Sequence, residues 1–291
     1  MLRPRRASHP YLMLAPTLFV LGAFFLLPLA VAAWQSLFRW DLLTAPRFVG
    51  AGNYRYLFAS GQVRQALGTT LAYAVVVVAG SLALGLLLAI AVNRPGRFVA
   101  FVRASVFSAY VVSWVSVALL FMWMLDADGG LIGRFFKAHD IAPMGLLSSP
   151  KTALYALAAV TVWKITGYAM VVFLAGLQDI PKELYEAAAL DGAGRLSRFV
   201  HVTWPMLRPT TAFVATTSLI VSFQAFDIVR VMTQGGPTRS TTVFVYAIYE
   251  HVFLNLRVGR ASAMVVLFFA VLLVLTVLQL WAWRSGERKA T

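Results

Sequence analysis

Six long apolar runs dominate the sequence, and their length constrains the fold more than any other feature. A helix of about 20 apolar residues matches the hydrocarbon thickness of a bilayer. The composition agrees, because 60% of the 291 residues are hydrophobic and only 12% are charged. The sequence therefore predicts an all-α polytopic membrane protein with six transmembrane helices, over residues 11–34, 68–92, 104–125, 152–177, 210–229 and 261–283.

The distribution of Lys and Arg predicts the orientation of these spans. Basic residues are denser in the N-terminus, the 93–103 loop, the 178–209 loop and the C-terminal tail than in the other three loops. An excess of Lys and Arg marks cytoplasmic loops. The contrast is modest, and it favours both termini in the cytoplasm. The predicted organisation is a cytoplasmic N-terminus (1–10), a first transmembrane helix (11–34), an external loop (35–67), a core (68–283) with a cytoplasmic loop (178–209), and a cytoplasmic tail (284–291).

Several chemistries are excluded by residue types that the sequence lacks. No cysteine is present, which excludes disulfides and thiolate metal sites. No Gly-x-x-x-x-Gly-Lys-Ser/Thr segment occurs, so nothing in this chain is expected to hold the phosphates of ATP. The four histidines lie far apart. We therefore predict no metal, no bound cofactor and no catalytic residues. The net charge of +14 comes mostly from residues beside the apolar runs, so no nucleic-acid partner is expected.

A polar insert between the fourth and fifth apolar runs is predicted to form two short helices. Pro181 suits the start of a helix, and the alanines that follow Glu186 propagate it well. Gly192 and Gly194 are expected to end it in the left-handed conformation. Residues 195–203 then predict a second helix, which stops before Pro205. Two interpretations are open: a docking site for a soluble partner, or a helix lying on lipid headgroups with Ala187 and Ala188 facing lipid.

The same segment resembles the EAA loop of ABC importer permeases. The residues that carry the resemblance are Glu186, Ala187, Ala188, Gly192, Val202 and Pro205, at the spacing of that motif. Val202 stands where the motif usually has Ile, and Trp204 stands where it usually has Leu. The Asp191-Gly192-Ala193 run and Pro209 are typical of the sugar-transport branch.

Further segments extend the resemblance to about residues 68–283. Trp163-Lys164, Gly167, the 173–178 run and Ile180-Pro181 look like the helix that leads into the loop in this branch. Phe226-Asp227 and the 232–237 run look like a signature of the first of two paired permeases of the maltose and glycerol-3-phosphate type.

The resemblance implies a type I importer fold and a set of partners. These are a second homologous permease, an ATPase dimer that holds ATP and Mg, and an extracytoplasmic solute-binding protein. It implies a bacterial inner-membrane protein that transports a sugar, an oligosaccharide or a glycerol-phosphate-type solute and is not itself an enzyme. The implied ATPase-coupling residues are Glu186, Ala187, Ala188, Asp191, Gly192, Ala193 and Pro205.

Polar and aromatic residues inside the apolar runs are candidates for a solute path. They are Trp163, Lys164, Ser222, Gln224 and Asp227. A lysine at mid-span costs about 2.5–3.5 kcal/mol on insertion scales, so it is expected to face a cavity or a partner. The alternative is an ion pair or hydrogen bond inside the bundle. Gln224 and Asp227 are predicted to share one face of the fifth span, where they would line a solute path or form an interhelical hydrogen bond.

Two other classes of membrane protein are weighed against the importer. An ion-coupled secondary transporter usually carries acidic residues inside its spans and broken helices, and here only Asp227 qualifies. An intramembrane enzyme needs a nucleophile or a metal set within the spans, and none is recognisable.

Overall fold

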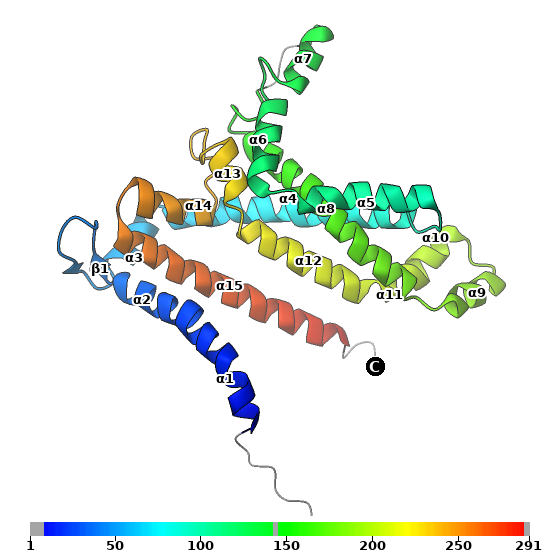
Figure 1. The fold of residues 1–291 in the computed structure, drawn as a ribbon, viewed down its shortest axis with the longest axis horizontal. Coiled ribbons are helices and arrows are strands. Elements are labelled where there is room, and N and C mark those ends of the chain that lie inside the picture. The colour runs from blue at the N-terminus through cyan, green and yellow to red at the C-terminus, as the bar shows by residue number, and fades with distance from the viewer. Residues whose placement is uncertain (1–8, 142–144, 288–291) are drawn as a thin grey trace, which may run out of the picture. The chain divides into compact units, whose positions relative to one another are not determined.

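The computed structural model describes residues 9–141 and 145–287, in which helices predominate (Figure 1). The chain forms two compact units: unit 1 contains residues 1–64 and 247–291, and unit 2 contains residues 65–246. The N-terminal residues 1–8 and the tail residues 288–291 of the predicted topology lie outside the described residues. The α-helices are α1 (His9–Leu21), α2 (Leu27–Gln35), α3 (Gly52–Ala59), α4 (Gln62–Ala91), α5 (Arg97–Val111), α6 (Trp114–Met124), α7 (Leu131–Ala138), α8 (Ala153–Gln178), α9 (Lys182–Leu190), α10 (Arg195–Arg198), α11 (Trp204–Met206), α12 (Arg208–Phe223), α13 (Asp227–Met232), α14 (Phe244–Tyr249) and α15 (Val258–Glu287).

The predicted helical class is confirmed, and the predicted spans are recognisable with two breaks. Among the described residues, four stretches are long and apolar enough to cross a membrane: Met13–Gln35, Gln62–Ala91, Ala153–Gln178 and Val258–Gln279. The α5–α6 pair makes a fifth span if the bent pair crosses as one. The remaining predicted span corresponds to α12, which has 16 residues, and to α13 after a break.

In unit 1, the first span carries a π-helical turn, η1 (Gly22–Leu26), between α1 and α2. Pro28 follows this turn and has no N–H to donate to the preceding turn of helix. The amide of Leu27 donates to the carbonyl of Gly22, so the wider turn lies where the regular ladder is interrupted. After α2, the strands β1 (Phe38–Arg39) and β2 (Arg47–Phe48) form an antiparallel hairpin in which Phe38 pairs with Phe48.

Residues 244–254 form α14 and the π-helical turn η3 (Glu250–Leu254). The apolar helical stretch Phe244–Leu254 is shorter than the membrane spans. It crosses the boundary between the two units at Ala247.

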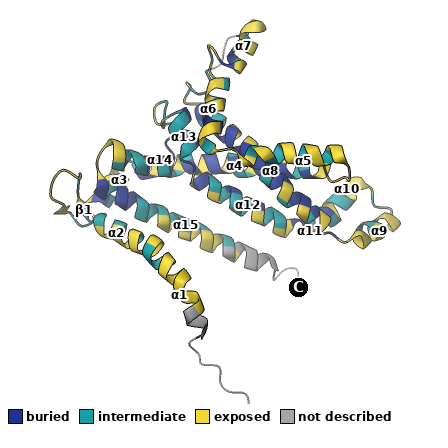
Figure 2. Ribbon diagram, viewed as in Figure 1, coloured by how far each residue is buried: buried dark blue, intermediate teal, exposed yellow. Residues whose placement is uncertain are grey.

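In unit 2, α8 is the central helix. Buried residues run along its whole length (Figure 2), and 72% of its apolar 18-residue stretch is buried. Close packing depends on a small residue: a Cβ added to Gly167 would lie 2.4 Å from the carbonyl oxygen of Val106 in α5. Small residues at helix contacts let backbones approach closely in membrane proteins. Gly167, which the resemblance singled out in the sequence, therefore lies where α5 packs against α8.

The third predicted span, 104–125, is not one helix, which corrects the sequence-based expectation. It divides into α5 and α6, which meet at an angle of 99°. The carbonyl groups at the end of α5 need donors once the helix stops. Lys164 of α8 supplies them: its Nζ donates to the carbonyl oxygens of Ala109 (3.3 Å), Tyr110 (3.0 Å) and Val112.

The fifth predicted span, 210–229, is also broken, at residues 224–226 between α12 and α13. Gln224 follows the last residue of α12, and Asp227 is the first residue of α13. The expectation that these two side chains share one helix face is therefore wrong. They lie on either side of the break.

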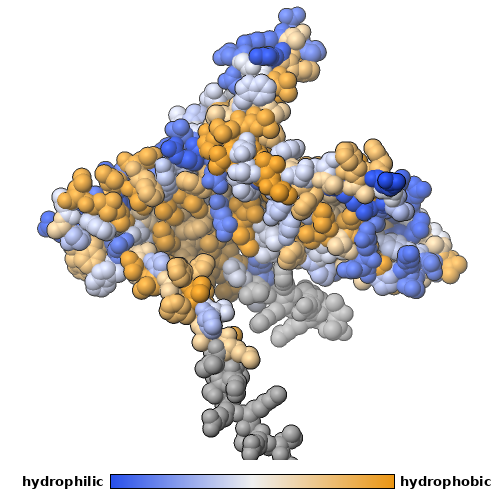
Figure 3. Space-filling view, viewed as in Figure 1, coloured by the Kyte–Doolittle hydropathy of each residue, from blue (hydrophilic) through white to orange (hydrophobic). Residues whose placement is uncertain are grey.

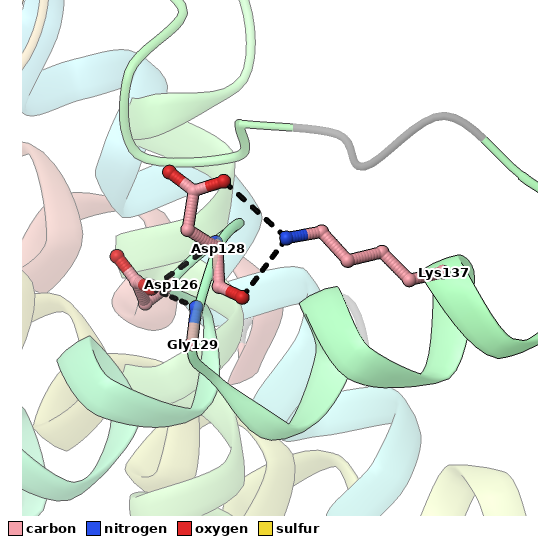
Figure 4. Close-up of polar contacts among 4 residues, drawn as sticks. All are labelled: Asp126, Asp128, Gly129 and Lys137. Carbon is pink, nitrogen blue, oxygen red and sulfur yellow. Dashed lines mark hydrogen bonds and ion pairs between the residues drawn. The ribbon is translucent and has the colours of Figure 1, made fainter.

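The turn between α6 and α7 is held by a small polar network (Figure 4). Asp126 Oδ1 accepts hydrogen bonds from the amides of Asp128 (3.1 Å) and Gly129 (2.7 Å). Lys137 of α7 lies 3.5 Å from the carboxylate of Asp128 and donates to its carbonyl oxygen at 3.0 Å. The Gly129 amide is the largest cause of the lowered pKa of Asp126. Asp126 therefore stays ionised and keeps the turn closed at neutral pH.

Candidate functional site

The polar insert forms two helical arms joined by a tight turn, as predicted. Pro181 lies just before α9 in an extended conformation (φ −56°, ψ 133°). At the other end, Gly192 has φ +76°, in the left-handed region that glycine occupies without strain. The amide of Ala193 donates to the carbonyl of Ala188 (2.9 Å), and that of Gly192 donates to Ala189 (3.1 Å). These two bonds define a Schellman cap, which fixes the end of α9.

Two details of the insert differ from the sequence-based expectation. Gly194 is extended (φ −69°, ψ 174°) and precedes α10, so it does not adopt the left-handed conformation. The second arm does not stop before Pro205: it continues through the π-helical turn η2 (Phe199–Thr203) into α11. The amide of Trp204 donates to the carbonyl of Phe199 in this wider turn. As at Pro28, the π-helical turn precedes the proline and lets the helix continue past it.

The two arms are tied to each other and to the spans of unit 2. The Tyr185 hydroxyl of α9 lies 3.0 Å from the Thr203 hydroxyl of the second arm. Tyr185 also packs against a buried cluster that includes Phe173, Leu177 and Leu207. The cluster contains residues of α4, α8 and α12. Through Tyr185, α9 is therefore in packing contact with these longer helices.

The outer surface of the insert combines polar and apolar residues. Glu186 and Ala187 are exposed, whereas Ala188 and Ala193 are half-buried. Leu190 is 90% exposed and Leu196 is 77% exposed, on either side of the Gly192 turn. Figure 3 shows hydrophilic residues gathered over α9 and α10 at one end of unit 2. The two leucines therefore add apolar side chains to an otherwise hydrophilic surface.

A cavity of about 200 Å³ lies next to the break between α12 and α13. Two of the predicted solute-path residues, Gln224 and Asp227, line it. Tyr73, Trp114 and Thr161 line it too, and the sequence did not single them out. The Tyr73 hydroxyl lies 2.5 Å from the Thr161 hydroxyl. Trp114 begins α6 directly after the bend, so the break in the third span brings its ring to the cavity.

The other three candidates for the solute path do not line this cavity. Trp163 packs edge-on against Phe121, with ring centroids 5.0 Å apart. Lys164 is 1% exposed and lies on the end of α5, with its Nζ 4.8 Å from the centroid of Trp114. Ser222 is buried and donates to the carbonyl of Ser218 at 2.7 Å. Their contacts correspond to the alternative of hydrogen bonds and packing inside the bundle.

A second cavity, of about 190 Å³, shares Val221 with the first. It is lined by Tyr110 and Tyr168, whose rings stack at 5.1 Å, and by Thr217 and Ser218. Together the two cavities place hydroxyl, amide, carboxylate and aromatic groups along α12. In the described part of the chain, no group of three or more His, Cys, Asp or Glu side chains is arranged to hold a metal ion.

Comparison with known proteins assigns the chain to a family. Residues 81–284 match the model of the family described as "Binding-protein-dependent transport system inner membrane component". The chain is similar to sn-glycerol-3-phosphate transport system permease protein UgpA of Agrobacterium fabrum, at 32% identity over 93% of this chain and 92% of the relative. The corresponding protein of Yersinia pestis is also 32% identical, over 96% of this chain and 94% of the relative.

A solved structure agrees with this assignment. The crystal structure of a bacterial ABC transporter involved in the import of the acidic polysaccharide alginate contains a chain that matches 96% of this one, with 95% of its own length covered. The TM-score is 0.80 and the sequence identity is 25%.

The chain belongs to the family of inner-membrane components of binding-protein-dependent transport systems. It is an ABC transporter permease with the fold of ABC importer permeases, and hence a transport component and not an enzyme. The family resemblance found in the sequence is confirmed.

Proposed function

We propose that this chain is one of two homologous permeases in an ATP-driven importer for a sugar, an oligosaccharide or a glycerol-phosphate-type solute. The relatives named for sn-glycerol-3-phosphate transport and the alginate importer support this solute class. The observation that carries the coupling part of the proposal is the Schellman-capped α9, which presents Glu186, Ala187 and the exposed Leu190 at the end of unit 2. The exposed Leu196 of α10 lies beyond the Gly192 turn. A separate ATPase, which holds ATP and Mg, is the proposed partner of this surface.

The proposed mechanism transmits ATPase closure through α9. Nucleotide binding brings the two ATPase subunits together, and α9 moves with the subunit that it contacts. The Tyr185–Thr203 contact and the cluster around Phe173 and Leu207 carry this displacement to α8 and α12. The paired permeases then open outward and accept solute from an extracytoplasmic binding protein, with both termini of this chain in the cytoplasm. Such a rigid-body change is a recurrent basis of two-state switching.

The cavity at the α12–α13 break is the proposed contribution of this chain to the solute path. Its hydroxyl, amide and carboxylate groups match the hydrogen-bonding needs of a sugar, and Trp114 offers an aromatic face. No basic side chain lines this cavity among the described residues. A phosphate on the solute would therefore be bound by the second permease. The alternative of an ion-coupled transporter is disfavoured by the family assignment.

Replacing Gln224 by alanine or Asp227 by asparagine is expected to raise the KM for solute by roughly tenfold. A hydrogen bond contributes about 0.5–1.5 kcal/mol between neutral groups and about 1.5–3 kcal/mol when one group is charged, and 1.4 kcal/mol corresponds to a factor of ten. The measurement is solute uptake by the assembled transporter in vesicles. Ser222→Ala is the matched control, because Ser222 is nearby but outside the cavity lining. An unchanged KM in both variants, or an equal change in the control, would contradict the assignment of this cavity.

A further inference from the structure

Unit 1 contains a basic pocket that the proposed transport function does not use. The pocket holds about 320 Å³ and lies between the β1–β2 hairpin, α3 and the start of α15. Its walls are fixed by Asn53, which is buried and donates from Nδ2 to the carbonyls of Ser36 (2.7 Å) and Phe38 (2.9 Å). The lining residues are Arg39, Trp40, Asp41, Asn53, Arg257, Gly259 and Arg260.

The charges in this pocket are unbalanced. Three guanidinium groups, those of Arg39, Arg257 and Arg260, face one carboxylate, that of Asp41. The amide of Thr44 is the first cause of the lowered pKa of Asp41, followed by the Thr44 hydroxyl, so this carboxylate is ionised at neutral pH. Asp41 Oδ1 accepts from both Thr44 groups at 2.8 Å. Among the described residues, no ion pair within 4.0 Å joins Asp41 to the arginines. The pocket therefore keeps a net positive charge.

Arg260 is positioned to recognise an oxyanion. Its guanidinium carbon lies 3.5 Å from the centroid of the Tyr56 ring, so stacking fixes the plane of the group. Its Nη1 is buried and has no hydrogen-bond partner among the described residues. A buried charged donor without an acceptor is unfavourable, so a bound acceptor would be stabilising. The planar donor fork of arginine suits phosphate and carboxylate oxygens in particular.

The location of the pocket points to one source of that oxyanion. Gln35 ends the first apolar span, and Val258 begins the last one. The Ser262 hydroxyl donates to Gln35 Oε1 at 3.4 Å, so these two ends lie side by side. The pocket therefore lies where two spans leave the hydrocarbon layer, at the level of lipid headgroups. Exposed apolar side chains of α2, such as Leu27 and Val31, continue from there into the membrane.

We propose that this pocket binds the phosphate group of an anionic phospholipid, in the leaflet on the membrane face opposite the two chain termini. Arg257 and Arg260 would hold the phosphate oxygens, and the acyl chains would lie along the apolar surface below. A recessed site with a buried Nη1 fits a headgroup phosphate better than a side chain of a folded protein partner. This inference is independent of solute and of ATP.

The test is native mass spectrometry of the full chain, purified in detergent, stripped of lipid and titrated with phosphatidylglycerol. The wild-type chain is expected to bind one lipid with an apparent Kd at least tenfold lower than the Arg257→Gln/Arg260→Gln variant. The matched control is Arg47→Gln/Arg55→Gln, which removes two exposed arginines of the same region that do not line the pocket. The control is expected to bind like the wild type. The single variant Arg257→Gln leaves Arg260 stacked on Tyr56, and it is also expected to weaken lipid binding.

Competition separates the possible sources of the anion. Inorganic phosphate at millimolar concentration is expected to displace the lipid only partly, because the acyl chains add affinity. Equal lipid binding by the wild type and by both double variants would overturn the proposal. Binding of inorganic phosphate by a wild-type chain that does not bind phosphatidylglycerol would also overturn it. A third outcome would also overturn it: the Arg257→Gln/Arg260→Gln variant binds lipid like the wild type, but in the assembled transporter the solute-binding protein no longer stimulates ATP hydrolysis. That result would indicate a protein-docking site.

Discussion

Replacing Lys164 by methionine is expected to lower the thermal stability of the chain while leaving the KM for solute unchanged. Lysine and methionine have similar length, but methionine cannot donate to the three carbonyl oxygens at the end of α5. A buried polar group left without a partner costs about 1–3 kcal/mol. The loss is therefore expected to loosen the 99° bend between α5 and α6. The measurements are the unfolding temperature in detergent and the KM for uptake.

The control for this variant is Lys151→Met. Lys151 is exposed and lies just before α8, so its replacement is expected to change neither quantity. A raised KM for Lys164→Met at unchanged stability would contradict the structural role and would return Lys164 to the solute path. A lowered uptake rate together with lowered stability is expected, because less of the protein stays folded.

Replacing Gly192 by aspartate is expected to reduce solute-stimulated ATP hydrolysis in the assembled transporter by roughly tenfold. Gly192 has φ +76°, a left-handed conformation that costs a residue with a Cβ up to about 1–2 kcal/mol, and aspartate there also adds a negative charge at the negative end of the α9 dipole. The Schellman cap that fixes the end of α9 depends on this conformation. The variant is expected to retain basal ATP hydrolysis, because the ATPase is a separate chain.

The same substitution two residues later provides the matched control. Gly194 is extended and precedes α10, a position at which aspartate is a favoured N-cap. Nothing lies within 4 Å of a Cβ added there. Gly194→Asp is therefore expected to keep stimulated hydrolysis near the wild-type rate. Full coupling in Gly192→Asp, or equal loss in both variants, would argue against a specific role for the α9 cap.

The apolar runs and the polar insert could be predicted from the sequence because both depend on local signals. Span length follows from hydropathy, and the end of α9 follows from Gly192. The predicted conformation of Gly194 was wrong, because glycine also suits an extended position. The predicted stop before Pro205 was wrong, because a π-helical turn lets the helix continue past a proline that has no N–H. The sequence pattern at these two sites allows both outcomes.

The breaks in the third and fifth spans could not be predicted, because no glycine or proline marks them. Residues 112–113 and 224–226 contain neither residue type. The first break depends on Lys164, which lies 52 residues along the chain from Val112. The cavity next to the second break combines residues from α4, α6, α8, α12 and α13, so Tyr73, Trp114 and Thr161 carried no signal in the sequence.

The central claim is that α9 contacts an ATPase, and a single introduced thiol tests it most directly. The chain contains no cysteine, so Ala187→Cys creates a unique thiol at an exposed position of α9. Phe135→Cys, on α7, is the control at a 58% exposed position that is predicted to lie on the other side of the membrane. A thiol–amine cross-linker applied to the assembled transporter is expected to join the ATPase to the Ala187→Cys permease and not to the Phe135→Cys permease. Absence of an ATPase adduct at position 187, or adducts of equal yield at both positions, would contradict the account.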